Sequence, residues 1–341
     1  MVISSLFEGL GNQLFQYAIA RCIAHRQNSE VKLSIKNFLG TRERHHSFYK
    51  LNNFNVQENF ATEAEIESAT RVGEPPNSSG IFIPEILDSP PNVILGGCFQ
   101  NEKYFAEIRE ILLEEFTLKN PLGKTSAAWR EKILSAECAV SVHVRHGDYL
   151  TYGLRNMFGL LPSEYYFKCV EELRKDFPNL TVFVFSDDLD WCKDNLKFNV
   201  PTEFVESCEH DFEEMHLMSL CKHNIISNST FAWWGAWLNK NLDKKVLAPD
   251  PWFATDPRMA IVPESWIKIP NTCHLWTPPM LSVIVYSEIQ IIIKVVVYSV
   301  ITIIITKIIV YSEIPIIIKA VDYSEMLINK EEDYLETLPQ I

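Results

Sequence analysis

The stretch CAVSVHV at 138–144 decides the fold, because a strand that is almost continuously apolar is typical of a sheet buried on both faces. Similar apolar runs follow in the second half of the chain, at 180–185, 203–205, 224–226 and 245–248. Helical patterns alternate with these runs, at 163–176, 188–196, 211–222 and 230–240. Strands that alternate with helices build a parallel sheet. We therefore predict a Rossmann-type α/β domain over 124–280, with its ligand at the carboxyl ends of the strands.

The first third of the chain opens with an apolar run at 2–7, a glycine-containing loop at 8–12 and a helical pattern. This order predicts a separate N-terminal α/β domain over 1–123. A further helix is predicted over 102–116. The sequence NPLG at 120–123 then predicts the linker between the two domains.

The composition is that of an ordinary globular protein, with 47% apolar and 22% charged residues among 341. Its 44 acidic side chains exceed the 31 basic ones, so the formal net charge is −13. This balance argues against a nucleic-acid binder, which needs excess Lys and Arg to meet phosphates. The eight cysteines form no CxxC pair, and MVIS at the start has no basic or cleavable apolar region. We expect reduced cysteines, no signal peptide and a cytoplasmic location.

Residues 281–341 differ from the rest, since Tyr-Ser recurs there beside isoleucine-rich runs that each end in a lysine. The β-branched content predicts strands, and such runs are prone to associate with one another. The apolar run between Lys294 and Lys307 is shorter than the roughly twenty residues that a membrane-spanning helix needs. We therefore expect a β-rich repetitive tail outside the catalytic core, which promotes self-association or peripheral attachment to a membrane.

The loop GLGNQ at 9–13 begins like the GxGxxG fingerprint of dinucleotide-binding proteins. Leu14 occupies the position of the third glycine, which argues against NAD or FAD. The chain also contains no P-loop pattern. Two interpretations remain: a loop whose backbone approaches a ligand, or a plain tight turn.

His143 and Arg145 are candidates for anion binding, because alternate residues of a strand share a face. A buried arginine is costly unless an anion meets it, and its planar guanidinium suits a phosphate. The alternative is a structural salt bridge between Arg145 and Asp148, since Gly147 permits a sharp turn after the strand.

The stretch FSDDLD at 185–190 places three carboxylates directly after a hydrophobic strand. Asp188 and Asp190 match the DxD element with which one class of glycosyltransferases holds a divalent metal. Carboxylates here would also suit the hydroxyls of a ribose or the edge of a base. The structural alternative is that Ser186 or Asp187 caps the next helix.

The stretch SNST at 227–230 leads from a strand straight into a helix. The N–H groups and dipole at a helix start favour an anion, and the hydroxyls of Ser229 and Thr230 add donors. The tryptophans that follow, at 233, 234 and 237, are expected to pack this helix on the sheet.

Taken in order, GLGNQLFQYA at 9–18, HVRHGDY at 143–149, FSDD at 185–188 and SNSTFAWWGAWL at 227–238 resemble the α-1,2-fucosyltransferases of glycosyltransferase family 11. ILGGCFQNEKYF at 94–105 is also similar to that family. The resemblance implies a two-domain GT-B-like fold, in which the acceptor is expected on the side of the N-terminal domain over 1–123. It also implies an inverting transfer of L-fucose from GDP-β-L-fucose to the 2-hydroxyl of a terminal galactose, without a metal or other cofactor.

The resemblance further implies roles for single residues. Arg145 is expected to bind the β-phosphate and to stabilise the charge of the departing GDP. His143 is expected to orient the phosphate or the nucleotide. The other implied donor contacts come from the glycine loop, the aspartates after a strand and the helix start: Gly11, Asn12, Asp187, Asp188, Ser229 and Thr230.

Asp148 is the predicted catalytic base, because it is a carboxylate beside Arg145; a salt bridge between the two is the alternative. The chain departs from the family at two positions. Glu8 stands where the family usually has a glycine, and His146 stands where it usually has a second arginine. A neutral histidine lacks the fixed charge of arginine, so the second change predicts weaker binding of the pyrophosphate.

Two other functions stay open on the sequence alone. One is a metal-dependent glycosyltransferase that uses Asp188 and Asp190 as ligands. The other is a non-catalytic protein that binds a sugar nucleotide or a glycan. Loss of activity in a chelator would favour the first, and binding without release of GDP would favour the second.

Overall fold

The computed structural model describes residues 1–38, 48–75, 78, 80–150, 158–254 and 261–271. Met1–Trp276 forms one compact unit. The other unit, Thr277–Ile341, lies outside the described residues, and so does the tail predicted over 281–341. That prediction, together with the domain limits 1–123 and 124–280, stays a prediction.

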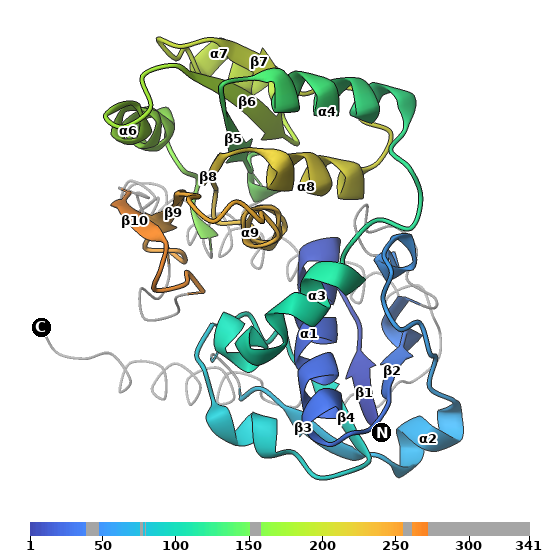
Figure 1. Ribbon diagram of the computed structural model, residues 1–341. Helices are drawn as coiled ribbons and strands as arrows, with labels where there is room; N and C mark the ends of the chain where they lie inside the picture. The colour runs from blue at the N-terminus through green and yellow to red at the C-terminus, as the bar shows by residue number, and fades with distance from the viewer. Residues whose placement is uncertain (39–47, 76–77, 79, 151–157, 255–260, 272–341) are drawn as a thin grey trace, which may run out of the picture. The chain divides into compact units, whose positions relative to one another are not determined.

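The second half of the described chain forms a six-stranded parallel sheet with the order β10-β9-β8-β5-β6-β7 (Figure 1). Its strands are β5 (Cys138–Val144), β6 (Leu180–Ser186), β7 (Thr202–Phe204), β8 (His223–Ile225), β9 (Val246–Asp250) and β10 (Ile267–Pro270). The sheet grows to one side from β5 and to the other from β8. The strand order therefore reverses between β5 and β8, and such a topological switch point is where open α/β sheets bind ligands.

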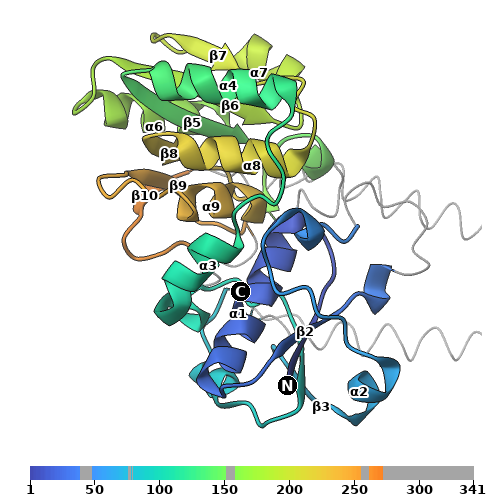
Figure 2. The ribbon, with the colours of Figure 1, turned by 45° about the vertical axis from the view of Figure 1, so that its right-hand side comes forward.

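Helices cover both faces of this sheet (Figures 1 and 2). One face packs against α4 (Lys124–Ser135), α8 (Asp211–Leu220) and α9 (Thr230–Trp237). The other face packs against α6 (Ser163–Arg174) and α7 (Leu189–Asn195). Every residue of β5 is buried, because alternate side chains enter the two layers. The α/β class with a parallel sheet, predicted from the sequence, is confirmed.

A smaller parallel sheet precedes it, with four strands in the order β2-β1-β4-β3. These strands are β1 (Val2–Ser5), β2 (Val31–Ser34), β3 (Thr70–Gly73) and β4 (Val93–Gly96). Helix α1 (Leu10–Arg26) connects β1 to β2, and α2 (Glu63–Ser68) precedes β3. The strand order reverses between β1 and β4, so the first sheet has a switch point of its own.

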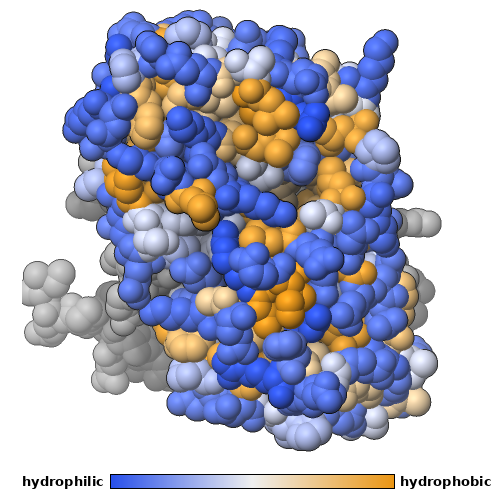
Figure 3. Space-filling view, in the orientation of Figure 1, coloured by the Kyte–Doolittle hydropathy of each residue, from blue (hydrophilic) through white to orange (hydrophobic). Residues whose placement is uncertain are grey.

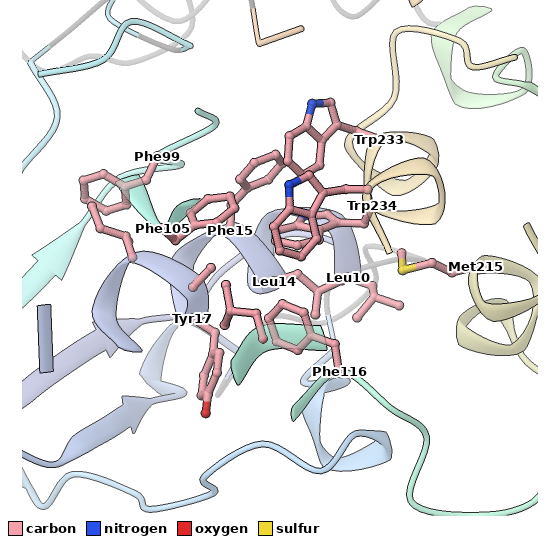
Figure 4. Close-up of a cluster of buried hydrophobic side chains, with 14 of the residues drawn as sticks. Leu10, Leu14, Phe15, Tyr17, Phe99, Phe105, Phe116, Met215, Trp233 and Trp234 are labelled. Carbon is pink, nitrogen blue, oxygen red and sulfur yellow. The ribbon is translucent and has the colours of Figure 1, made fainter. Parts of the chain in front are cut away.

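Helix α1 packs against α9 and joins the cores of the two sheets. The ring of Phe15 lies 4.6 Å from that of Trp233 and 4.9 Å from that of Trp234, measured between centroids. The indole Nε1 of Trp234 donates a 2.9 Å hydrogen bond to the carbonyl of Gly11. Figure 4 shows these rings in one cluster with Phe105. The tryptophans therefore do more than hold α9 on its sheet, because they also bury α1.

Two local expectations are wrong. The helix predicted over 102–116 forms only in its second half, as α3 (Arg109–Glu115), after two 3-10 turns at Glu102–Tyr104 and Ala106–Ile108. Tertiary contacts override the helical pattern there, since the Tyr104 hydroxyl accepts a 3.0 Å hydrogen bond from the Ile83 amide. The glycine loop is also shorter than expected, because α1 begins at Leu10.

On the face shown in Figure 3, hydrophilic residues predominate, and they separate the apolar patches from one another. In the described part of the chain, no helix is long and apolar enough to span a bilayer.

Gly11→Ala tests how closely α1 must approach α9. An added Cβ would lie 2.6 Å from the Phe231 amide nitrogen and from the Thr230 carbonyl carbon, and backbone atoms cannot rotate away. We expect a loss of about 1–3 kcal/mol in the free energy of unfolding, measured by urea denaturation. Gly96→Ala is the matched control, because nothing lies within 4 Å of a Cβ at that position. Equal losses in the two variants would contradict the close approach as the cause.

Candidate functional site

The residues of the second half of the chain that were predicted to bind the donor come together at the switch point of the second sheet. Strand β5 pairs with both β6 and β8, so the loops that follow these three strands meet at one edge. Those loops carry Arg145, His146, Asp187, Asp188, Ser229 and Thr230. The clustering expected from parallel strands is thus present in the structure.

His143 lies beneath this edge and is only 4% exposed. Its Nδ1 is 2.9 Å from the Ser227 hydroxyl, and its ring centroid is 5.7 Å from that of Phe231. Burial and the positive charge of Arg145 lower the pKa of His143 to about 3, so the imidazole is neutral at neutral pH. His143 therefore ties β5 to the loop after β8 across the switch point. The predicted effect of His143 on the phosphate would act through Ser227, because the His143 ring itself is buried.

Arg145 is half-buried at the end of β5, where an anionic ligand is expected. Its Nη1 is 3.3 Å from Oδ2 of Asp187, and its guanidinium carbon is 5.9 Å from the centroid of the Tyr149 ring. The contact with Asp187 engages Nη1, one of the three nitrogens of the guanidinium. Asp148 begins the 3-10 turn Asp148–Leu150, but its side chain lies outside the described part of the structure. Its role as the base and its salt bridge to Arg145 stay predictions.

Asp187 and Asp188 both have structural partners. Oδ1 of Asp187 accepts a 2.9 Å hydrogen bond from the His146 amide. Asp188 caps α7 by accepting from the Trp191 amide at 3.1 Å, and its Oδ2 is 2.7 Å from His146 Nδ1. These hydrogen bonds, that of His146 first, hold the pKa of Asp188 below its usual value. The prediction that Ser186 or Asp187 caps this helix is wrong, because the cap is Asp188. The predicted contact of the aspartates with ribose or guanine stays a prediction.

His146, which stands where the family usually has an arginine, is held on three sides. Its ring stacks on that of Trp191 with centroids 4.5 Å apart and 21° between the planes. Its amide and its Nδ1 contact Asp187 and Asp188 respectively. This histidine therefore braces the loops after β5 and β6.

The start of α9 forms the other half of the candidate anion site. Ser229 occupies the N-cap position without a side-chain hydrogen bond to the helix, and it is 6% exposed. Thr230, the first helical residue, is half-buried. The first N–H groups of any helix have no partner within it, so they and the helix dipole favour an anion. Gly11 permits this helix start to lie directly against α1, because a Cβ on Gly11 would meet the Thr230 hydroxyl at 2.6 Å.

Asn12 lies at the switch point of the first sheet, one residue beyond this contact. Its Oδ1 accepts a 2.7 Å hydrogen bond from Gln100 Nε2, in the loop that follows β4. Its Nδ2 donates to the carboxylate of Glu8, in the loop that follows β1. The predicted glycine loop and the predicted helix start, far apart in sequence, are thus neighbours in the structure.

Glu214 on α8 is a further candidate, which the analysis of the sequence missed. Burial, and then the negative charges of Asp211 and Asp187, raise the pKa of its carboxyl to about 7. Within the described residues the Glu214 carboxylate has no hydrogen bond or ion pair. Asp211 lies three residues before Glu214 on the same helix, but the burial of Glu214 and its proximity to Asp187, in the loop after β6, cannot be seen in the sequence.

No group of three or more His, Cys, Asp or Glu side chains is arranged to hold a metal ion within the described ranges. Asp188 already serves as a helix cap, and Asp190 is exposed in the first turn of α7. The metal-dependent alternative that uses Asp188 and Asp190 stays a prediction.

The model of glycosyl transferase family 11 matches residues 87–270, which is more than half of the chain. This chain belongs to glycosyltransferase family 11. The matched range contains β5, β6, β8 and the start of α9, and hence every residue of the candidate donor site on the second sheet.

Several known proteins are similar to this chain. The chain is 32% identical to the alpha-1,2-colitosyltransferase of Escherichia coli over 292 residues, which cover 79% of this chain and 99% of that protein. It is 27% identical to galactoside alpha-(1,2)-fucosyltransferase 1 of Leontopithecus chrysomelas over 191 residues, 51% of this chain and 52% of that one. Among solved structures, fucosyltransferase NodZ from Bradyrhizobium is similar with 17% identity and a TM-score of 0.43, covering 69% of this chain and 91% of NodZ.

Glu214→Gln tests the charge of the newly identified carboxyl. The pKa of Glu214 is raised in the folded protein, so its contribution to stability is present at low pH and is lost as the pH rises through about 7. We expect the variant to melt higher than the wild type at pH 8, by about 2–4 °C for each kcal/mol gained, with a smaller difference at pH 5. Scanning calorimetry at the two pH values measures this.

Glu67→Gln is the control, because Glu67 is exposed on α2. The explanation fails if Glu214→Gln shifts the melting temperature equally at both pH values.

Proposed function

We propose that this family 11 glycosyltransferase moves L-fucose from GDP-β-L-fucose to the 2-hydroxyl of a terminal galactose, with inversion at the anomeric carbon. The observation that carries the proposal is that Arg145 follows β5 and the uncapped start of α9 follows β8, and these two adjacent strands flank the switch point of a parallel sheet. The names of the relatives support the α-1,2 linkage and a galactoside acceptor. A GT-B-like arrangement of two α/β domains belongs to the same proposal.

The proposed chemistry follows from the charges of the site. The diphosphate of the donor binds between the guanidinium of Arg145 and the first turn of α9, with Ser229 and Thr230 as hydroxyl donors. As the bond from the sugar to the β-phosphate breaks, negative charge grows on the departing GDP, and these groups stabilise it. The sugar passes through an oxocarbenium-like state, which is usual for glycosyl transfer. Charge from the protein thus takes the place of a metal ion.

Transfer of a colitosyl group is the second candidate, because the relative with 32% identity carries that name. The two candidates share the site, the linkage and the leaving group in this proposal, and they differ only in the sugar.

The deciding experiment measures release of GDP from GDP-fucose and from a GDP-colitose donor across a panel of galactosides, followed by linkage analysis of the products by NMR. We expect an α-1,2-linked product and release of GDP that depends on the acceptor. Binding of the donor without any release would favour the non-catalytic sugar-nucleotide protein instead. The same assay in excess EDTA is expected to retain its rate; a loss restored by manganese would favour Asp188 and Asp190 as metal ligands.

Arg145→Lys is expected to be nearly as damaging as Arg145→Ala. Lysine keeps the charge but lacks the fork that holds two phosphate oxygens at once. Loss of one donor to the transition state typically lowers kcat about 100-fold or more. Steady-state kinetics of both variants, with their melting temperatures as a check on folding, measure this effect. A lysine variant with most of the wild-type rate would show that Arg145 acts by its charge alone.

A further inference from the structure

Glu8 has a backbone conformation that its side chain disfavours. Its φ is +63°, in the left-handed region, where a residue with a Cβ pays about 1–2 kcal/mol and a glycine pays almost nothing. The family usually has a glycine at this place. The strained residue lies at the carboxyl end of β1, beside the switch point of the first sheet. Strain retained at such a place points to a function of the side chain.

The structure holds both the backbone and the carboxylate of Glu8 in place. The buried amide of Gln13 donates a 2.8 Å hydrogen bond to the Glu8 carbonyl. Nδ2 of Asn12 donates to the Glu8 carboxylate, and Gln100 Nε2 holds the other end of Asn12 at 2.7 Å. A chain of hydrogen bonds across the switch point, from Gln100 through Asn12, therefore orients an exposed carboxylate.

The same turn lies next to the proposed binding site for the diphosphate. Gly11 meets the backbone of Thr230 and Phe231, so the loop from Glu8 to Asn12 adjoins the first turn of α9. In the proposed function the diphosphate binds to loops of the second sheet, whereas Glu8 lies in the loop after β1 of the first sheet. Inversion requires the acceptor oxygen to attack from the side opposite the leaving group, and its base belongs on that side too.

We propose that Glu8 is the catalytic base of the transfer; this rests on the proposed function. The Glu8 carboxylate takes the proton of the acceptor hydroxyl while the acceptor oxygen forms its bond to the anomeric carbon. The bond from that carbon to the β-phosphate oxygen breaks, and its electron pair leaves with GDP, held by Arg145 and α9. Glu8 thus replaces Asp148 as the base that the sequence suggested.

Glu8→Gln is the first test, because glutamine keeps the shape and the hydrogen bond from Asn12 but cannot take a proton. We expect kcat to fall about 100-fold to 10,000-fold, while the affinity for GDP and the KM for the donor change no more than about threefold. The acidic limb of the pH–kcat profile should disappear in the variant. A merely structural role for Glu8 would leave that limb in place.

Glu8→Gly is the second test, because it removes the carboxylate and relieves the left-handed strain together. We expect this variant to be at least as stable as the wild type, with the same loss of kcat, and formate to restore at least about tenfold as a replacement base. Glu67→Gln, on the exposed face of α2, is the control and should keep the wild-type rate.

A Glu8→Gly variant with kcat within about threefold of the wild type would overturn the proposal. So would a loss of the acidic limb and rescue by formate in Asp148→Asn rather than in the Glu8 variants. Either outcome concerns the base alone, because the wild type would still transfer the sugar. Failure of the wild type to release GDP from any donor would instead count against the proposed function.

Discussion

The close approach of α1 to α9 is the contact on which the rest of the site depends. Gly11 lies against the backbone of Thr230 and Phe231, and the Trp234 indole donates to the Gly11 carbonyl. Each pair of aromatic rings around this contact adds about 0.5–1.5 kcal/mol beyond the area that the rings bury. Because the contact joins the first turns of two helices, it sets the switch point of the first sheet beside that of the second.

The electrostatics of the site follow from this arrangement. Arg145 and the start of α9 provide the positive charge for an anion. The carboxylate of Asp187 contacts Arg145 and the His146 amide, and that of Asp188 contacts the His146 ring and caps α7. Burial, and then the negative charges of Asp211 and Asp187, raise the pKa of Glu214 to about 7. In a protein of net charge −13, the proposed binding of a diphosphate would therefore depend on local geometry rather than on the overall charge.

Much of the fold could be predicted because parallel strands leave a strong local pattern. The run at 138–144 is β5 of the structure, and the run at 180–185 is β6 extended by one residue. The prediction of a helix over 102–116 is wrong around Tyr104 and Phe105, because contacts of these buried aromatic side chains compete there with the helical pattern. Candidate side chains were found because polar residues at strand ends are visible in sequence, whereas their partners are not. His143 shows the difference: its place in the strand was predictable, but its burial and its bond to Ser227 were not.

The sequence by itself determined the α/β class, most of the strands of the second sheet, the motifs at their carboxyl ends and the resemblance to family 11. These features depend on periodicity and on short stretches of contiguous residues. Only the tertiary structure decided that Gly11 packs against α9, that the charge of Asp187 raises the pKa of Glu214, and that Glu8 adopts a left-handed conformation beside Asn12. The hydrogen bond from Trp234 to Gly11 spans 223 residues of sequence. Burial and pKa arise from such distant neighbours, because desolvation and charge act through space and not along the chain.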